Sequence, residues 1–198
     1  MKNIRLTVWI GMMCGCLAAG MLQAGTRPDN ACPAEEDGSR LWLPVMRPAE
    51  GAEVEVIYKG KVSPTIAIAI AELKNAWKGE PVLLEKKRTG QGDGFAITSS
   101  EHQVRILSST EAGLLYGVYC LLRMQAAGQV TVPLSVTEQP VYDLRILNHW
   151  DNPDGTVERG YAGRSLWNWE ELPGTLSPRY EAYARANASV GINGTVLN

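Results

Sequence analysis

Two strand patterns with a capped helix between them most constrain the fold at the carboxyl end of this chain. Residues 143–148 (DLRILN) and 192–198 (INGTVLN) are short strand candidates. Ser177 and Pro178 begin the intervening helix as N-cap and first helical residue, and Gly191 ends it. A strand, a helix and a strand in this order predict a βαβ unit, in which the two strands run parallel.

Residues 41–140 alternate strand and helix patterns and predict a small α+β domain with one sheet and two helices. One predicted helix begins at Ser63-Pro64, and the other begins at Thr110 and stops at Gly128. A polar connection between the last two strands favours a hairpin. The predicted strands are residues 52–58, 82–85, 95–98 and 104–107.

A glycine-rich segment (residues 86–94) joins the second and third predicted strands. Its glycines do not precede a helix, so the helix N-terminus that binds phosphate in nucleotide sites is missing, and we expect a flexible hairpin connection. Its basic residues 86–88 have no aromatic side chains between them, which favours a solvated turn over nucleic-acid binding. The net charge of -2 likewise indicates no nucleic-acid partner.

The amino terminus has the pattern of a secretory signal peptide over residues 1–24. Basic residues precede an apolar run that is shorter than the roughly 20 residues of a membrane-spanning helix. We therefore expect export to a periplasm or outside the cell, with no other membrane association. Lipid attachment at Cys16 is the less favoured alternative. A polar segment, residues 25–40, then leads into the predicted α+β domain.

The cysteines and histidines predict neither a metal site nor a cofactor. Cys32 and Cys120 remain after signal removal; they could pair in an exported protein, but Cys120 lies on the apolar face of a predicted helix, where a buried thiol fits equally well. The two histidines, His102 and His149, have no second ligand at helical or strand spacing.

The connection between the last predicted strand and helix, residues 149–176, is longer than the roughly 4–6 residues of a typical loop. Its tryptophans are interleaved with carboxylate, amide and guanidinium side chains. Such a mixture suits carbohydrate recognition, because aromatic faces stack on sugar C–H groups while polar groups bind hydroxyls. A hydrophobic cluster that packs the loop down is the alternative for Trp167 and Trp169.

His149, Trp150, Asp151 and Asn152 directly follow the first strand of the predicted βαβ unit. The carboxyl ends of parallel strands are where βα barrels and open α/β sheets bind ligands. We therefore expect these four residues to lie at or beside a binding site.

Residues 147–167 (LNHWDNPDGTVERGYAGRSLW) resemble the first-strand signature of the xylan α-glucuronidases of glycoside hydrolase family 67. Residues 183–198 (YARANASVGINGTVLN) resemble the first barrel helix and second strand of the same family. Residues 94–124 are similar to the accessory domain that precedes the barrel in this family and in β-hexosaminidases. Pro153 departs from the family pattern, in which a leucine-like residue is expected.

The resemblance implies a β-hexosaminidase-like α+β accessory domain (residues 41–140), followed by the first strand, helix and strand of a (β/α)8 TIM barrel (residues 141–198). Such a barrel takes about 200 residues or more. We therefore expect the barrel to be incomplete here, and the chain to be an amino-terminal fragment that is inactive alone.

The activity implied is inverting hydrolysis of the bond between glucuronic acid, or its 4-O-methyl ether, and xylooligosaccharides (aldouronic acids) in xylan degradation. Inversion needs two carboxylates about 6.5–9.5 Å apart. In the family these come from later barrel strands, so no catalytic residue is assigned to this chain. By position, Trp150 would wall the uronic-acid pocket, with His149, Asp151 and Asn152 as its neighbours. A homodimer is one option for the whole enzyme.

Two alternatives from other functional classes remain at this point. A non-catalytic carbohydrate-binding module would bind xylan through residues 25–140, and a hexosaminidase-like barrel hydrolase would act on N-acetylhexosamine substrates. No catalytic role is assigned to Asp151, Asp154 or Glu158, which could equally fix the long loop. Asn187 and Asn193 occupy glycosylation sequons, but both are interpreted as structural residues.

Overall fold

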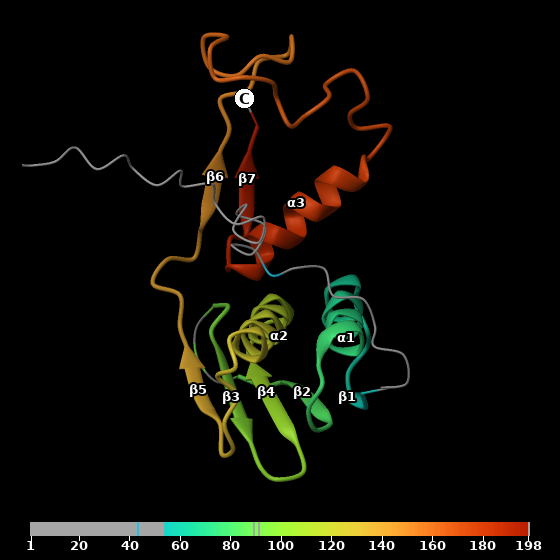
Figure 1. Ribbon diagram of the computed structural model, residues 1–198, viewed down its shortest axis with the longest axis vertical. Coiled ribbons are helices and arrows are strands. Elements are labelled where there is room, and N and C mark those ends of the chain that lie inside the picture. Colours follow the sequence, from blue (N-terminus) through green and yellow to red (C-terminus); the bar gives the residue numbers. More distant parts are fainter. Residues whose placement is uncertain (1–42, 44–53, 89, 91, 198) are drawn as a thin grey trace, which may run out of the picture.

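The computed structural model describes residues 43, 54–88, 90 and 92–197 (Figure 1). The expected signal peptide, the segment 25–40, Cys16 and Cys32 lie outside this range. We call residues 54–138 the sheet unit and residues 146–196 the βαβ unit. The elements, in chain order, are β1 (Val56–Tyr58), α1 (Pro64–Ala76), β2 (Val82–Lys86), β3 (Phe95–Ser99), β4 (Val104–Ser108), α2 (Glu111–Ala126), β5 (Ser135–Glu138), β6 (Ile146–Asn148), α3 (Pro178–Ser189) and β7 (Gly194–Val196).

The sheet unit contains a five-stranded mixed sheet in the order β1-β2-β4-β3-β5. β1, β2 and β4 are parallel, and β3 pairs antiparallel with both β4 and β5. The predicted β3–β4 hairpin is confirmed. The hairpin expected between β2 and β3 is wrong, because both strands flank β4 and residues 87–94 must cross from one side of β4 to the other.

All three helices begin at the predicted caps. The Ser63, Thr110 and Ser177 side chains accept hydrogen bonds from the backbone N–H groups of Ile66, Gly113 and Arg179, respectively. α1 and α2 pack against each other on one face of the sheet, as Figure 1 shows. Alternate residues of the strands point to this face, so that the sequence pattern of period two becomes one buried and one open surface.

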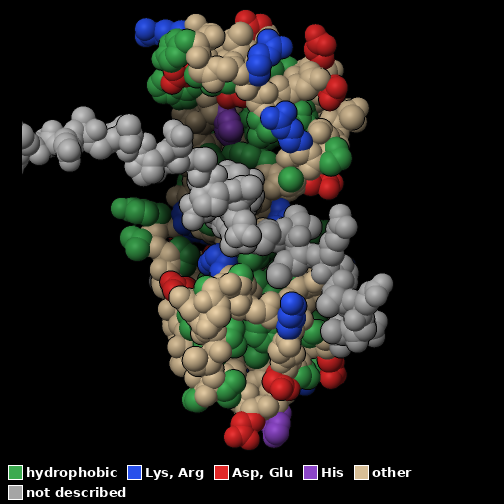
Figure 2. All heavy atoms as spheres, in the orientation of Figure 1, with side chains coloured by type: hydrophobic (Ala, Val, Ile, Leu, Met, Phe, Trp, Pro, Cys, Tyr) green, Lys and Arg blue, Asp and Glu red, His purple; other side chains and the backbone are tan. Residues whose placement is uncertain are grey.

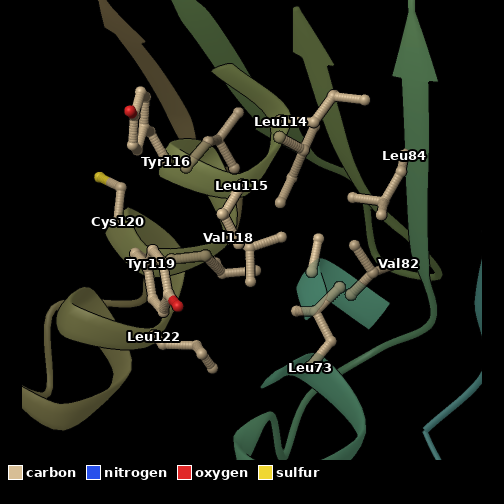
Figure 3. Packing of buried hydrophobic residues seen from close by; sticks show 14 of the residues in the cluster. Leu73, Val82, Leu84, Leu114, Leu115, Tyr116, Val118, Tyr119, Cys120 and Leu122 are labelled. Carbon is tan, nitrogen blue, oxygen red and sulfur yellow. The ribbon is translucent and has the colours of Figure 1, made fainter. Parts of the chain in front are cut away.

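The core of the sheet unit fills the space between the two helices and the sheet (Figure 3). Leu73 of α1, Leu84 of β2 and Leu122 of α2 are essentially inaccessible to solvent. Gly117 lies where α2 crosses β4, and a Cβ atom there would stand 2.5 Å from the Ile106 side chain. Cys120 is a buried free thiol, and burial raises its pKa. The expected burial of Cys120 is therefore confirmed, whereas its pairing with Cys32 concerns a residue outside the described range.

β5 was not predicted from the sequence. Its four residues, SVTE, are mostly exposed and show no buried apolar face. The strand forms by backbone pairing with β3 at the edge of the sheet, and Leu134 just before it is buried. α1 ends at Ala76, and Trp77 caps it while its indole is buried.

The βαβ unit consists of β6 and β7, which pair in parallel, and α3 between them in sequence. Both strands are shorter than the predicted 143–148 and 192–198. The Asn193 side chain accepts a hydrogen bond from the Arg145 backbone N–H and donates one to the Asp143 carbonyl, at 2.9 and 2.6 Å. The Asn193 backbone N–H also donates to the Arg145 carbonyl at 2.9 Å, so these side-chain bonds supplement one backbone bond where the strands were expected to extend.

Two arginines of the carboxyl-terminal residues contact the sheet unit. Arg185 of α3 donates to both carboxylate oxygens of Glu72 in α1, at 2.5 and 2.8 Å, and to the Leu43 carbonyl. Arg145 forms an ion pair with Asp93 at 3.3 Å and also donates to the Gly191 carbonyl. The partly buried Arg185–Glu72 contact fixes α3 against α1.

No helix within the described residues is long and apolar enough to cross a membrane.

Candidate functional site

The long connection, residues 149–176, lies at the carboxyl ends of β6 and β7, where both arrows point in Figure 1. The His149 N–H donates to the Val196 carbonyl at 3.0 Å, which continues the parallel ladder by one residue beyond β6. The long connection begins at this hydrogen bond. The surface around this connection, at the top of Figure 2, mixes hydrophobic, acidic and basic side chains.

His149 faces α3. Its Nε2 lies 2.6 Å from the Tyr183 hydroxyl, and its Nδ1 lies 3.5 Å from Oδ1 of Asp151. The imidazole also makes edge-to-face contacts with Trp167 and Tyr183, at centroid distances of 5.5 and 5.4 Å. Both ring nitrogens are therefore directed at protein groups, and His149 holds the start of the loop to the helix.

Asp151 is buried, with 5% of its surface exposed. Its Oδ2 accepts a hydrogen bond from the Ser165 hydroxyl, and that hydroxyl oxygen accepts one from the Trp167 backbone N–H at 2.9 Å. This network ties the beginning of the long connection to its middle. A carboxylate that is buried and paired in this way supports the loop.

Asn152 fixes the turn that follows. Its side-chain amide donates to the Thr156 hydroxyl and to the Glu158 carbonyl, both at 2.8 Å. Asp154 accepts hydrogen bonds from the backbone N–H and the hydroxyl of Thr156, and these bonds lower the pKa of the Asp154 carboxyl. The Asn152 and Asp154 side chains thus both form hydrogen bonds within the loop. For Asp154 this agrees with the interpretation that it fixes the loop.

Trp150 is the exposed member of the four predicted residues, with 59% of its surface accessible. It borders an open pocket of about 400 Å³. The lining residues are Trp150, Asp151, Asn152, Glu158, Arg159 and Tyr161. The structure thus brings three of the four predicted residues to one pocket, whereas His149 is not among its lining residues. Glu158, Arg159 and Tyr161 belong to the same long connection.

Trp167 packs the connection against α3, and Trp169 follows it two residues later in the same connection. The Trp167 ring contacts Tyr180 and Tyr183 of α3, at centroid distances of 5.0 and 5.4 Å. The indole N–H groups of both tryptophans are buried without a hydrogen-bond partner. For Trp167 this geometry favours the hydrophobic-cluster interpretation over direct sugar stacking.

Tyr183 and Ser165 were missed in the sequence because their partners are distant along the chain. Tyr183 lies three residues after Tyr180, and the spacing puts both rings on one face of α3. That spacing was the available signal for an aromatic face turned to the loop. Nothing in the sequence around Ser165 indicates that its hydroxyl meets Asp151.

The two sequon asparagines, Asn187 and Asn193, lie in the folded structure as a buried and a hydrogen-bonded side chain, respectively. Asn187 is 6% exposed within α3, and Asn193 is used between Arg145 and Asp143 as described above. Among the described residues, no group of three or more His, Cys, Asp or Glu side chains is placed to hold a metal ion.

Comparison with known proteins finds a family to which part of the chain is similar. Residues 124–198 match the model of the glycosyl hydrolase family 67 middle domain, and these residues include the whole pocket.

Several proteins named alpha-glucuronidase A are similar to part of this chain. A probable alpha-glucuronidase A from Neosartorya fischeri is 43% identical over 107 residues, and one from Aspergillus clavatus is 40% identical over 107 residues. The alpha-glucuronidase A of Aspergillus tubingensis is 39% identical over 106 residues. Each match covers 54% of this chain and 12% of the relative, so the chain matches only a small part of these proteins.

The fold has a counterpart among solved structures. A GH138 enzyme that targets pectin rhamnogalacturonan II superposes with a TM-score of 0.53, at 15% sequence identity. The superposition covers 73% of this chain and 24% of that enzyme. At this identity the likeness concerns the fold alone.

Proposed function

We propose that this chain is part of an α-glucuronidase that removes glucuronic acid or 4-O-methylglucuronic acid from xylooligosaccharides with inversion of the anomeric centre. The family match over residues 124–198 carries the proposal, because it contains the Trp150 pocket. The relatives named alpha-glucuronidase A support it further.

In the proposed site, the exposed face of Trp150 packs against the C–H surface of the sugar ring. Aromatic rings beside polar side chains are the usual composition of carbohydrate sites. Asp151 and Asn152 hold the pocket in place through the loop contacts described above, and His149 anchors the loop to α3 through Tyr183. None of the four is proposed as the catalytic acid or base.

The βαβ unit is proposed to be the first strand, helix and strand of a (β/α)8 barrel, preceded by a β-hexosaminidase-like accessory domain. The parallel pairing of β6 with β7 supports this proposal. So does the exposure of strand residues that a closed barrel would cover: Ile146, Leu147 and Val196 are 48%, 37% and 39% exposed. The catalytic carboxylates would follow on later strands, and residues 1–198 alone are expected to be inactive.

The carbohydrate-binding-module alternative is less well supported. Of the tryptophans in the described part of the sheet unit, only Trp77 is present, and it is 4% exposed with its indole N–H donated to the Glu80 carbonyl. The exposed tryptophan that could stack on a sugar is Trp150, which lies in the long connection.

Export through a signal peptide at residues 1–24 completes the proposal. Mass spectrometry of the mature protein recovered outside the cytoplasm would give the new amino terminus. We expect cleavage after Ala24, and recovery of an uncleaved amino terminus would contradict export by this route.

The activity is tested with the whole protein that contains residues 1–198 and with its Trp150→Ala variant, on aldotriouronic acid. The wild type should release the uronic acid, and loss of the indole should lower kcat/KM by about tenfold or more, mainly through KM. A wild type that acts only on N-acetylhexosaminides would contradict the proposed substrate. Unchanged kinetics in Trp150→Ala would remove Trp150 from the site.

A further inference from the structure

Glu158 has a backbone conformation that is unusual for its residue type. Its φ angle is +55°, and it is the one non-glycine residue with positive φ among the residues that the structure describes. In this region the Cβ atom of an L-residue crowds the backbone carbonyl, which glycine avoids. Such conformations persist where surrounding contacts impose them, and they concentrate at functional sites.

Two contacts from the pocket impose this conformation. The Glu158 backbone N–H donates to the Trp150 carbonyl at 2.6 Å, and the Glu158 carbonyl accepts from the Asn152 side chain at 2.8 Å. Both contacts use main-chain atoms of Glu158. A glycine would make them with less strain, so the turn itself gives no reason for a glutamate.

The Glu158 side chain lines the same pocket as Trp150. It is half-buried, and hydrogen bonding to the Glu158 carboxylate raises the pKa of Tyr161, which also lines the pocket. Tyr161 is 74% exposed, so this hydrogen bond faces solvent and can be exchanged for one from a ligand. The Glu158 side chain therefore lies at the pocket, beside an exposed tyrosine.

We propose that Glu158 is a sugar-binding residue, whose carboxylate accepts hydrogen bonds from the hydroxyl groups of the ring that packs on Trp150. This assignment rests on the proposed function and names a specificity-determining residue of that site. The two oxygens of a carboxylate can accept from two neighbouring hydroxyls, and hydrogen bonds to a charged acceptor are stronger than neutral ones. Like-charge repulsion directs the uronate group of the substrate away from Glu158 and leaves the hydroxyl edge facing it.

The test uses Glu158→Gly and Glu158→Gln in the whole protein, with aldotriouronic acid as substrate and thermal unfolding as a second measurement. Glu158→Gly removes both the carboxylate and the backbone strain, so we expect KM to rise about tenfold while Tm stays equal or increases. Glu158→Gln keeps the shape and loses the charge, and it should raise KM by a smaller factor of about five. Glu171→Gln, an exposed glutamate of the same connection, serves as the matched control and should leave both quantities unchanged.

The outcomes separate this assignment from the proposed function. An active wild type whose KM changes by less than twofold in both Glu158 variants overturns the assignment and leaves the proposed activity intact. A lower Tm in Glu158→Gly with unchanged kinetics also overturns it, because the side chain would then serve only the loop. A wild type that neither cleaves nor binds the oligosaccharide overturns the proposed function and this assignment together.

Discussion

The sheet unit and the βαβ unit are stabilised in different ways. The sheet unit encloses a continuous apolar core, in which Ile66, Leu121 and Leu122 are fully buried. The βαβ unit has exposed strand residues, and its long connection is held by side-chain hydrogen bonds such as those from Ser165 to Asp151 and from Asn152 to Thr156. A closed apolar core thus fixes the first unit, whereas the candidate site depends on side-chain hydrogen bonds together with the aromatic contacts of His149 and Trp167.

The largest expected difference between the units comes from removing the same side chain in each. In residues 1–198, Leu121→Ala should lower the free energy of unfolding by about 3 kcal/mol, because it leaves a cavity in a closed core. Leu147→Ala should lower it by less than about 1 kcal/mol, because Leu147 is already 37% exposed. Urea unfolding measures both values, and equal losses would contradict the contrast.

The same Leu147→Ala change sharpens the barrel proposal when it is made in the whole protein. If further strands cover β6, the cost should rise to about 2 kcal/mol or more. A cost that stays the same in the whole protein and in residues 1–198 would count against a closed barrel at this position.

The next effect concerns the contact between the units. Arg185→Met leaves the Glu72 carboxylate, which is largely buried, without its main partner, and should lower the free energy of unfolding by about 2 kcal/mol. Arg105→Met is the matched control, because the Arg105–Glu85 pair is more exposed and should contribute less than about 1 kcal/mol. Denaturant unfolding with a Glu72→Gln double-mutant cycle gives the coupling. No coupling between residues 72 and 185 would mean that the units are joined without this ion pair.

A smaller effect is expected inside the long connection. Ser165→Ala removes the hydroxyl that donates to the buried Asp151, and should cost about 1–2 kcal/mol. Ser100→Ala, in an exposed turn of the sheet unit, is the control and should cost less than about 0.5 kcal/mol. Amide hydrogen exchange should localise the change to residues 149–176. Unchanged exchange there would show that the Asp151 network does not hold the loop.

The smallest effect is a pH dependence in the sheet unit. Hydrogen bonds from Ser63, at 2.5 Å, and Lys86, at 3.0 Å, lower the pKa of Glu111 below its ordinary value of 4.5. A carboxyl whose folded-state pKa is depressed adds stability above its unfolded pKa, and this contribution is lost as pH falls through the lower folded-state pKa. The unfolding free energy should therefore fall more steeply below pH 4.5 in the wild type than in Glu111→Gln, and identical profiles would contradict the assignment.

The contrast between the units also explains what could be predicted from sequence. Helix caps are local, so Ser63, Thr110 and Ser177 were identified correctly from the residues themselves. β5 and the crossing of β4 depend on which strand edges are free in three dimensions, and no local pattern encodes them. Prediction therefore succeeded where neighbours in the chain determine the structure.

In the candidate site, too, only features set by neighbouring residues could be predicted. The position of residues 149–152 after a parallel strand predicted their place at the carboxyl end of β6, and the pocket beside Trp150 agrees with that expectation. The separate roles of these residues could not be predicted, because the partners of His149 and Asp151 are Tyr183 and Ser165, which lie far along the chain.

Proton NMR of the reaction tests the proposed activity most directly. The whole protein containing residues 1–198 is mixed with aldotriouronic acid, and the anomeric signals of the released 4-O-methylglucuronic acid are followed from the first minutes. Inverting cleavage of the α-linkage predicts that the β-anomer forms first and then equilibrates. Release of the α-anomer first would contradict the inverting mechanism, and no release of uronic acid would contradict the α-glucuronidase itself.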